Sequence, residues 1–257
     1  MEKAFKKRFA ILMLPTLIAF IIAFIIPFVL GIYLSFTKFT TVTDAQWIGL
    51  SNYIVAFRDK DFLASLLFTV KFVVVNLVTI NLIAFMLAYV LSRKLRGTNI
   101  FRTVIFMPNL LGGIVLGYIW QLIINGFLSF FKTTLTADAT YGFWGMVLAM
   151  NWQMIGYMMV IYIAAIQNIS EEIKEAALID GCTRWQTYWK IVFPLLKPTI
   201  ATVAIIDAMA FWNDYLLPSL VLGRKELYTL PIATQAFYGT YSTDLGLVMA
   251  ALLLAML

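Results

Sequence analysis

The chain has 257 residues, of which 62% are hydrophobic and only 12% are charged, with a formal net charge of +6. Soluble domains carry about 25% charged residues, so this composition excludes an ordinary soluble fold and predicts an all-α, polytopic membrane protein. The single cysteine, Cys182, excludes an internal disulfide and a cysteine-cluster metal site, and the absence of histidine removes the commonest general base. No catalytic, cofactor or metal-binding residue is therefore expected.

Five apolar segments are predicted to be long enough to cross the membrane, and a sixth begins near the end of the sequence, because about 20 apolar residues cover a hydrocarbon core of about 30 Å. In chain order they cover about residues 9–36, 63–91, 100–125, 143–169, 199–222 and 244–257. The sixth is too short to cross alone, at ~1.5 Å per residue, and is still apolar at Leu257, so we expect the natural protein to continue. No repeat or soluble domain is visible, so residues 1–257 are expected to form one transmembrane domain.

The basic residues of the short loops predict the orientation of the chain. Twelve lysines and arginines fall on the side that holds the N-terminus and the loop between the fourth and fifth segments, and six fall on the other side. Because cytoplasmic loops carry the excess of positive charge, the N-terminus and this loop are predicted to be cytoplasmic.

That cytoplasmic loop, residues 170–198, is a polar island between two long apolar segments. Ser170 is a predicted N-cap, and acidic residues follow it in the first helical turn. Gly181 permits a sharp turn, and Pro194 and Pro198 are expected to close a second helix. The pattern predicts two short helices hinged at Gly181 and lying outside the hydrocarbon.

The loop contains Glu-Ala-Ala at 175–177, Ile-Asp-Gly at 179–181, and then Trp185, Tyr188 and Pro194. This pattern resembles the "EAA" loop of permease subunits of binding-protein-dependent ABC importers, in the version found in maltose and other sugar permeases. The resemblance implies a type I importer permease fold, in which the loop is a coupling helix that docks on an ATP-binding subunit. The docking residues that it implies are Glu175, Ala176, Ala177, Asp180, Gly181, Trp185, Tyr188 and Pro194.

The resemblance also implies the partners of the chain. These are a second homologous permease subunit, two ATP-binding subunits, an extracellular or periplasmic solute-binding protein, and a sugar substrate, in the plasma (inner) membrane of a prokaryote. The sequence has no Gly-x-x-x-x-Gly-Lys-Ser/Thr phosphate loop, so ATP and Mg²⁺ are expected on the partner subunit and no cofactor in this chain. No nucleic-acid partner is expected.

Polar groups at membrane depth are costly and by default face the bundle interior or a path. Residues 212–215 resemble the "W-N-D/E-F" segment of carbohydrate permeases, and aromatic faces beside carboxylate and amide groups suit a sugar. The candidate substrate path comprises Trp212, Asn213, Asp214, Tyr215, Asn109 and Asn151. The alternative is that these residues belong to an interfacial belt or join helices to one another.

Two other classes of protein are alternatives. An ion-coupled secondary transporter would use Asp207, Asp214 and Lys71 as relay groups. It would lose uptake with a protonophore and keep uptake without ATP. An integral membrane enzyme is disfavoured by the lack of histidine and of polar loop chemistry.

Overall fold

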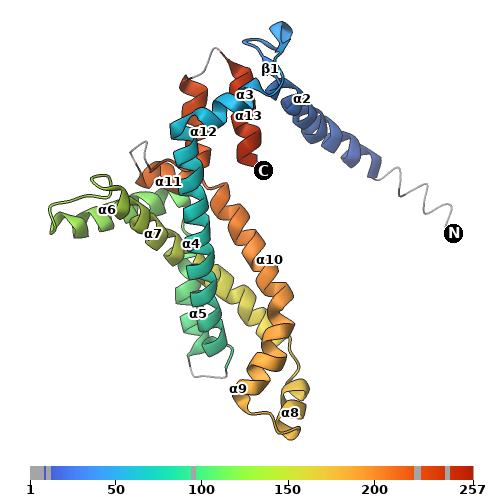
Figure 1. Cartoon of the computed structure of the whole chain (residues 1–257). Helices are drawn as coiled ribbons and strands as arrows, with labels where there is room; N and C mark the ends of the chain where they lie inside the picture. The colour runs from blue at the N-terminus through green and yellow to red at the C-terminus, as the bar shows by residue number, and fades with distance from the viewer. Residues whose placement is uncertain (1–8, 10–12, 94–96, 223–226, 241–243, 257) are drawn as a thin grey trace. The chain divides into compact units, whose positions relative to one another are not determined.

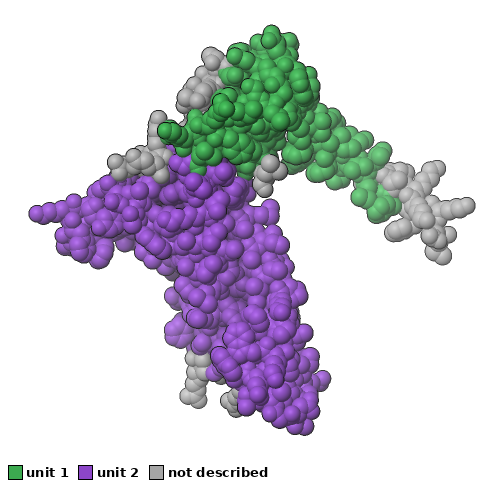
Figure 2. All heavy atoms as spheres, viewed as in Figure 1, with its two compact units in different colours: residues 1–63, 233–257 green, residues 64–232 purple. Residues whose placement is uncertain are grey.

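The structure is a computed structural model that describes residues 9, 13–93, 97–222, 227–240 and 244–256 (Figure 1). The predicted all-α class is confirmed. In the described ranges the strands are β1 (Thr37–Lys38) and β2 (Gln46–Trp47), which pair antiparallel in a short hairpin. The chain divides into two compact units, residues 1–63 with 233–257 and residues 64–232 (Figure 2).

Four helical segments of the described ranges are long and apolar enough to cross a membrane, and a bent pair of helices makes a fifth by length and composition. The helical elements are η1 (Ile21–Ile25), α2 (Ile26–Ser35), η2 (Val42–Asp44), α3 (Ser51–Arg58), α4 (Lys60–Leu91), α5 (Thr98–Phe106), η3 (Met107–Leu110), α6 (Gly113–Ser129), α7 (Ala139–Gln167), α8 (Glu171–Ile179), α9 (Arg184–Thr187), η4 (Tyr188–Val192), α10 (Phe193–Trp212), α11 (Leu216–Val221), α12 (Leu230–Thr240) and α13 (Leu245–Met256).

The third predicted segment, residues 100–125, is not one straight helix. Thr98–Leu110 and Gly113–Ser129 are bent by 100° relative to one another. Pro108 lies in the 3₁₀ turn η3 at the end of the first part, and Gly112 is extended at the start of the second. Proline has no N–H and its ring clashes with the carbonyl four residues earlier, so the helix cannot continue regularly through Pro108.

The fifth predicted segment, residues 199–222, has different bounds from those expected. The helical segment runs from Trp185 to Trp212, and residues 216–221 form the separate helix α11. The prediction that Pro194 and Pro198 close a short second helix is therefore wrong. The π-turn η4 widens the helix immediately before Pro194, and the helix continues through Pro194 and through Pro198, which lies inside α10.

Unit 1 brings residues 233–257 against the N-terminal segment that contains the β1–β2 hairpin. Asn52 of α3 donates from Nδ2 to the backbone oxygens of Ser35 and Thr37, at 2.8 and 2.9 Å. Gly246 of α13 lies against the same backbone, since a Cβ on Gly246 would be 1.7 Å from the oxygen of Thr37. The last helix is thus held directly against the start of the hairpin, in a space that only glycine fits.

Unit 2 is built around α4, α7 and α10. Its core is rich in methionine, leucine, isoleucine and phenylalanine, and its fully buried members include Phe72, Ile80, Met146, Met158, Met159, Leu196, Val203 and Phe211. Helix α7 also packs closely on α5, because a Cβ on Gly156 would lie 2.0 Å from the backbone oxygen of Ile105. Unit 2 contains the loop and the polar residues singled out from the sequence.

Candidate docking loop and polar path

The loop turns sharply between α8 and α9, as predicted. Gly181 has φ +83°, a backbone conformation that glycine adopts without penalty. Its N–H donates to the oxygen of Leu178 at 3.1 Å, and the N–H of Cys182 donates to the oxygen of Ala177 at 2.9 Å. This pair of bonds is a Schellman motif, which satisfies the last carbonyls of α8 and fixes the direction in which the chain leaves it.

The start of α9 is closed by a second capping arrangement that the sequence analysis did not use. The Thr183 N–H donates to Oε1 of Gln186 at 2.9 Å, and the Gln186 N–H donates to Oγ1 of Thr183 at 3.2 Å. This reciprocal pair is a capping box, and the spacing Thr-x-x-Gln is its sequence signal. In contrast, Ser170 lies at the predicted N-cap of α8 but makes no side-chain capping bond. The two caps make the turn between α8 and α9 a defined structure.

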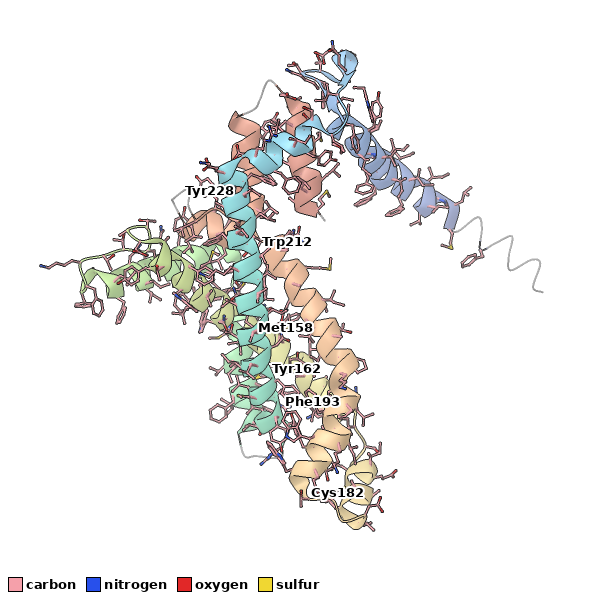
Figure 3. All side chains as sticks on the ribbon, viewed as in Figure 1. Met158, Tyr162, Cys182, Phe193, Trp212 and Tyr228 are labelled. Carbon is pink, nitrogen blue, oxygen red and sulfur yellow. The ribbon has the colours of Figure 1, made fainter. Side chains whose placement is uncertain are left out.

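Most of the predicted docking residues lie on the surface of the loop. Those exposed are Glu175, Ala176, Asp180, Gly181, Trp185 and Pro194. Ile179, at the end of α8, is 86% exposed and was missed, although the apolar residue before Asp180 in the motif was a signal for it. Figure 3 places Cys182, beside this turn, at the tip that α8 and α9 form. The tip therefore presents apolar, aromatic and acidic side chains together.

Two predicted docking residues face inward instead. Ala177 is buried, and the Tyr188 ring is half-buried against the helix α4. The ring centroid of Tyr188 lies 5.1 Å from that of Tyr89 and 6.3 Å from that of Phe85. Tyr188 is the first residue of the π-turn η4 and its ring faces α4, whereas Trp185, about one turn earlier, is exposed. The Tyr188 ring is therefore only partly accessible to a partner, and its centroid lies 6.3 Å from that of the exposed Trp185 ring, on which it stacks.

A hollow of about 660 Å³ lies beside the loop, where the end of α4 faces α7 and α8. Tyr89, Arg93, Gln167, Glu171 and Tyr188 are among the residues that line it. The loop therefore leaves an open space between itself and the ends of α4 and α7 on this side.

The predicted path residues 212–215 lie at a break between two helices. Helix α10 ends at Trp212, and Asn213 donates from Nδ2 to the Met209 oxygen at 2.9 Å. Asp214 Oδ1 accepts from the backbone N–H groups of Leu216 and Leu217, at 3.1 and 3.4 Å, at the start of α11. These side chains offer the backbone an alternative to continuous helix, and Pro218 cannot donate to the carbonyl of residue 214. Residues 212–215 were expected inside one continuous membrane helix, and they instead form a polar break between α10 and α11.

The bend between η3 and α6 lies beside this break. A Cβ on Gly113 would be 2.9 Å from Cδ2 of Leu216, and one on Gly117 would be 2.8 Å from Cδ1 of Leu220. The starts of α6 and α11 are thus in direct contact, and glycine on α6 permits it. Two interrupted apolar helices therefore meet where their polar, non-helical residues begin.

The two asparagines of the predicted path have different surroundings. Asn109 lies in η3, and its Nδ2 is 3.6 Å from Sδ of Met154 on α7. Asn151 is buried and donates from Nδ2 to Asn76 Oδ1 at 3.0 Å and to the Val147 oxygen at 2.9 Å. Asn151 thus joins α7 to α4, which favours the helix-joining alternative for this residue.

The family model described as "binding-protein-dependent transport system inner membrane component" matches residues 80–257. The chain is 40% identical over 243 residues to the probable starch degradation products transport system permease protein AmyD of Thermoanaerobacterium thermosulfurigenes, covering 87% of this chain and 81% of the relative. It is 27% identical to the multiple sugar-binding transport system permease protein MsmF of Streptococcus mutans, covering 70% of this chain and 66% of the relative.

A further relative is the sn-glycerol-3-phosphate transport system permease protein UgpA of Agrobacterium fabrum, at 29% identity over 70% of this chain and 64% of the relative. Among solved structures, the fold is similar to a chain of a bacterial alginate ABC transporter in complex with an alginate pentasaccharide-bound periplasmic protein. The TM-score is 0.79 at 20% identity, over 99% of this chain and 91% of that chain. At this identity the likeness shows a shared fold.

Proposed function

Because the chain belongs to the family of binding-protein-dependent transport system inner membrane components, we propose that it is the permease subunit of an ATP-driven ABC importer for a carbohydrate. The observation that carries the proposal is the loop between α8 and α9. Its exposed tip is rigidly capped at Gly181 and Thr183, and its second helix continues without interruption from Trp185 to Trp212. A partner that moves the tip therefore moves a helix of the transport domain.

The docking partner is an ATP-hydrolysing subunit, and Glu175, Asp180 and Trp185 are its main contacts on this chain. Large aromatic side chains such as that of Trp185 dominate the energetics of interfaces. The acidic groups of Glu175 and Asp180 pair with basic groups on the partner. Exposed Ile179 adds an apolar contact beside them. A second permease subunit, a second ATP-binding subunit and an external solute-binding protein complete the importer.

The chain is a multi-pass plasma-membrane protein, and we place its N-terminus and the docking loop in the cytoplasm. The support is the excess of lysine and arginine on that side of the predicted spans. This orientation puts the tip at Gly181 on the side where ATP is available.

A carbohydrate is supported by the relatives and by the chemistry of the helix break. AmyD and MsmF are described as transporting starch degradation products and multiple sugars. At the break, Trp212 and Tyr215 offer ring faces for C–H groups, and Asn213 offers an amide to hydroxyls. Interrupted helices that meet inside a bundle are where transporters place substrates. We assign Trp212–Tyr215 to the substrate path, with Asn109 at the neighbouring break.

The test uses the complete importer in proteoliposomes with ATP inside and its solute-binding protein outside. The probes are radiolabelled maltotriose, an alginate oligosaccharide and sn-glycerol 3-phosphate. We expect uptake of a sugar that requires internal ATP and is unaffected by a protonophore. Uptake that persists without ATP and is abolished by the protonophore would instead identify an ion-coupled transporter. Transport of sn-glycerol 3-phosphate alone would contradict the carbohydrate assignment and leave the ATP-driven importer standing.

A further inference from the structure

A buried chain of polar groups crosses the centre of unit 2. The hydroxyl of Tyr162 on α7 donates to Oδ1 of Asn81 on α4 at 2.5 Å, and Nδ2 of Asn81 donates to Oδ2 of Asp207 on α10 at 2.7 Å. Tyr162 is 1% exposed and Asp207 is 0% exposed. Three helices that are distant in sequence are thus joined by two consecutive side-chain hydrogen bonds.

The surroundings of this cluster make its position informative. Asp207 Oδ1 is buried without a hydrogen-bond partner among the described residues. A half-satisfied polar group in an apolar core is costly, and the surrounding packing must hold it in place. Neutral polar side chains such as asparagine are often used only to join membrane helices. A buried carboxylate within such a helix is costly and by default marks a functional position, so Asp207 calls for an explanation beyond helix joining.

The cluster is connected to the docking loop by aromatic contacts. Tyr188, at the start of η4, packs on the ring of Phe85 on α4. Phe85 in turn meets the ring of Tyr162 edge-on at 5.4 Å between centroids. Tyr162 therefore touches the aromatic contacts through its ring and the polar cluster through its hydroxyl. Figure 3 labels Tyr162 in the interior of unit 2, between Cys182 at the loop and Trp212 at the helix break.

The long helical segment Trp185–Trp212 therefore contacts α4 at two points. Tyr188 holds it near the docking loop, and Asp207 holds it about 28 Å further along, given the rise of ~1.5 Å per residue. Asp207 lies about one and a half turns before the end of the helix at Trp212, where the candidate path begins. Its position is therefore suited to govern how the end of the segment moves.

We propose that Asn81 and Asp207 are positioning residues that tie the moving segment Trp185–Trp212 to α4 near the helix break. When the docking loop is displaced, the tie makes the break at Trp212–Tyr215 rearrange with α4 and α7. Without it, the end of α10 slides past α4, and ATP is hydrolysed without opening the path. The role requires a hydrogen-bond acceptor at residue 207, and it does not require a charge. This inference rests on the proposed ATP-driven transport.

The test measures sugar molecules transported per ATP hydrolysed, for complexes in proteoliposomes. The informative variant is the double substitution Asn81→Leu with Asp207→Leu in a Tyr162→Phe background, because replacing all three hydrogen-bonding side chains leaves no member of the cluster unpaired and keeps the ring of residue 162. We expect near wild-type ATPase activity and a transport-to-ATP ratio lowered about five-fold, the factor that about 1 kcal/mol corresponds to. Asp207→Asn is the matched control, because its side-chain oxygen accepts the same bond, and its ratio is expected to stay near wild type.

Each outcome is decisive. A double variant with a wild-type ratio overturns the tie. Loss of transport in Asp207→Asn overturns it in favour of a role for the charge of Asp207. A double variant that fails to assemble while Asp207→Leu alone assembles contradicts the physical basis of the proposal. If the wild-type complex itself shows no ATP-driven uptake, the proposed function fails, which is distinguishable because that arm contains no substitution.

The aromatic contact gives an independent arm. If the aromatic contacts of Tyr188 and the hydrogen bond of Asp207 act together, Phe85→Leu should lower the ratio of transport to ATP hydrolysed. Adding Phe85→Leu to the double variant should then lower the ratio little further. Fully additive losses would show that the aromatic contacts and the polar cluster act separately. That result would contradict the connection between them.

Discussion

Gly113 at the start of α6 lies against Leu216 at the start of α11, with only 2.9 Å between the position of a Cβ on Gly113 and Cδ2 of Leu216. This contact brings together the two interruptions of the apolar helices. The side chain of Leu216 is flexible, so it can yield to a methyl group. Backbone atoms cannot move aside in this way. A substitution at a glycine that faces backbone is therefore expected to cost more stability than one at a glycine that faces a side chain.

Gly156→Ala is expected to destabilise the protein more than Gly113→Ala. The new methyl group on α7 would lie 2.0 Å from the backbone oxygen of Ile105, so α5 and α7 must move apart. Overpacking of this kind costs about 1–3 kcal/mol. Thermal unfolding of the purified complex in detergent measures the difference. Gly126→Ala is the matched control, because no atom lies within 4 Å of that Cβ, and an equal loss in all three variants would contradict the close packing.

Gly181→Val is expected to impair ATP-driven transport while leaving membrane insertion intact. A β-branched residue at φ +83° is strained by about 1–2 kcal/mol, and relief of the strain unwinds the turn between α8 and α9. Gly181→Asn is the control, because asparagine tolerates this conformation and should retain most transport. Co-purification of the ATP-binding subunit and substrate-stimulated ATPase activity are the measurements. If both are normal in Gly181→Val, the loop is not the coupling element.

The orientation is checked by labelling intact cells with a membrane-impermeant thiol reagent. In a Cys182→Ser background, Thr134→Cys in the loop after α6 is expected to react from outside. Thr183→Cys, beside the docking turn, is expected to react only after the cells are opened, because the charge distribution places it in the cytoplasm. Both chosen residues are exposed. Labelling in the opposite order would reverse the orientation and remove the docking assignment.

Asp214→Asn separates two roles of this residue. Asparagine retains a side-chain oxygen that caps the start of α11, while Asp214→Ala removes the cap at a cost of about 1 kcal/mol. If Asp214 contacts substrate through its charge, Asp214→Asn should raise the half-saturating sugar concentration with basal ATPase activity unchanged. Trp212→Leu should do the same by removing a ring face. Normal transport in both variants would make the break purely structural.

The sequence predicted the parts of this structure that depend on local chemistry. The short helix Glu171–Ile179 and the left-handed turn at Gly181 follow from nearby residues, and the structure has both, although Ser170 makes no capping bond. The continuation of the second helix through Pro194 was not predictable from proline alone, because the π-turn before it depends on packing of Tyr188 against α4. The break at Asp214 had local signals in Asn213, Asp214 and Pro218, but the apolar residues around them favoured the prediction of one continuous helix.

The pairing of Asn81 with Asp207 had no sequence signal, although Asp207 alone stands out as a charged residue within a predicted span. The two residues lie 126 positions apart, and each taken alone is a single polar residue in an apolar helix. Only the packing of α4 beside α10 brings them within hydrogen-bond distance. Periodicity and composition indicate which segments are helices and do not encode long-range pairings of this kind.

The seating of Gly246 against Thr37 has a consequence for biosynthesis. The two residues are about 200 positions apart, so the hairpin leaves the ribosome long before its partner helix exists. At about 5–20 residues per second, that interval is roughly 10–40 s. Residues 64–232 are all synthesised within it and can assemble first. The packing of the N-terminal hairpin is therefore completed late, when α13 has been synthesised and Gly246 can pack against the backbone oxygen of Thr37.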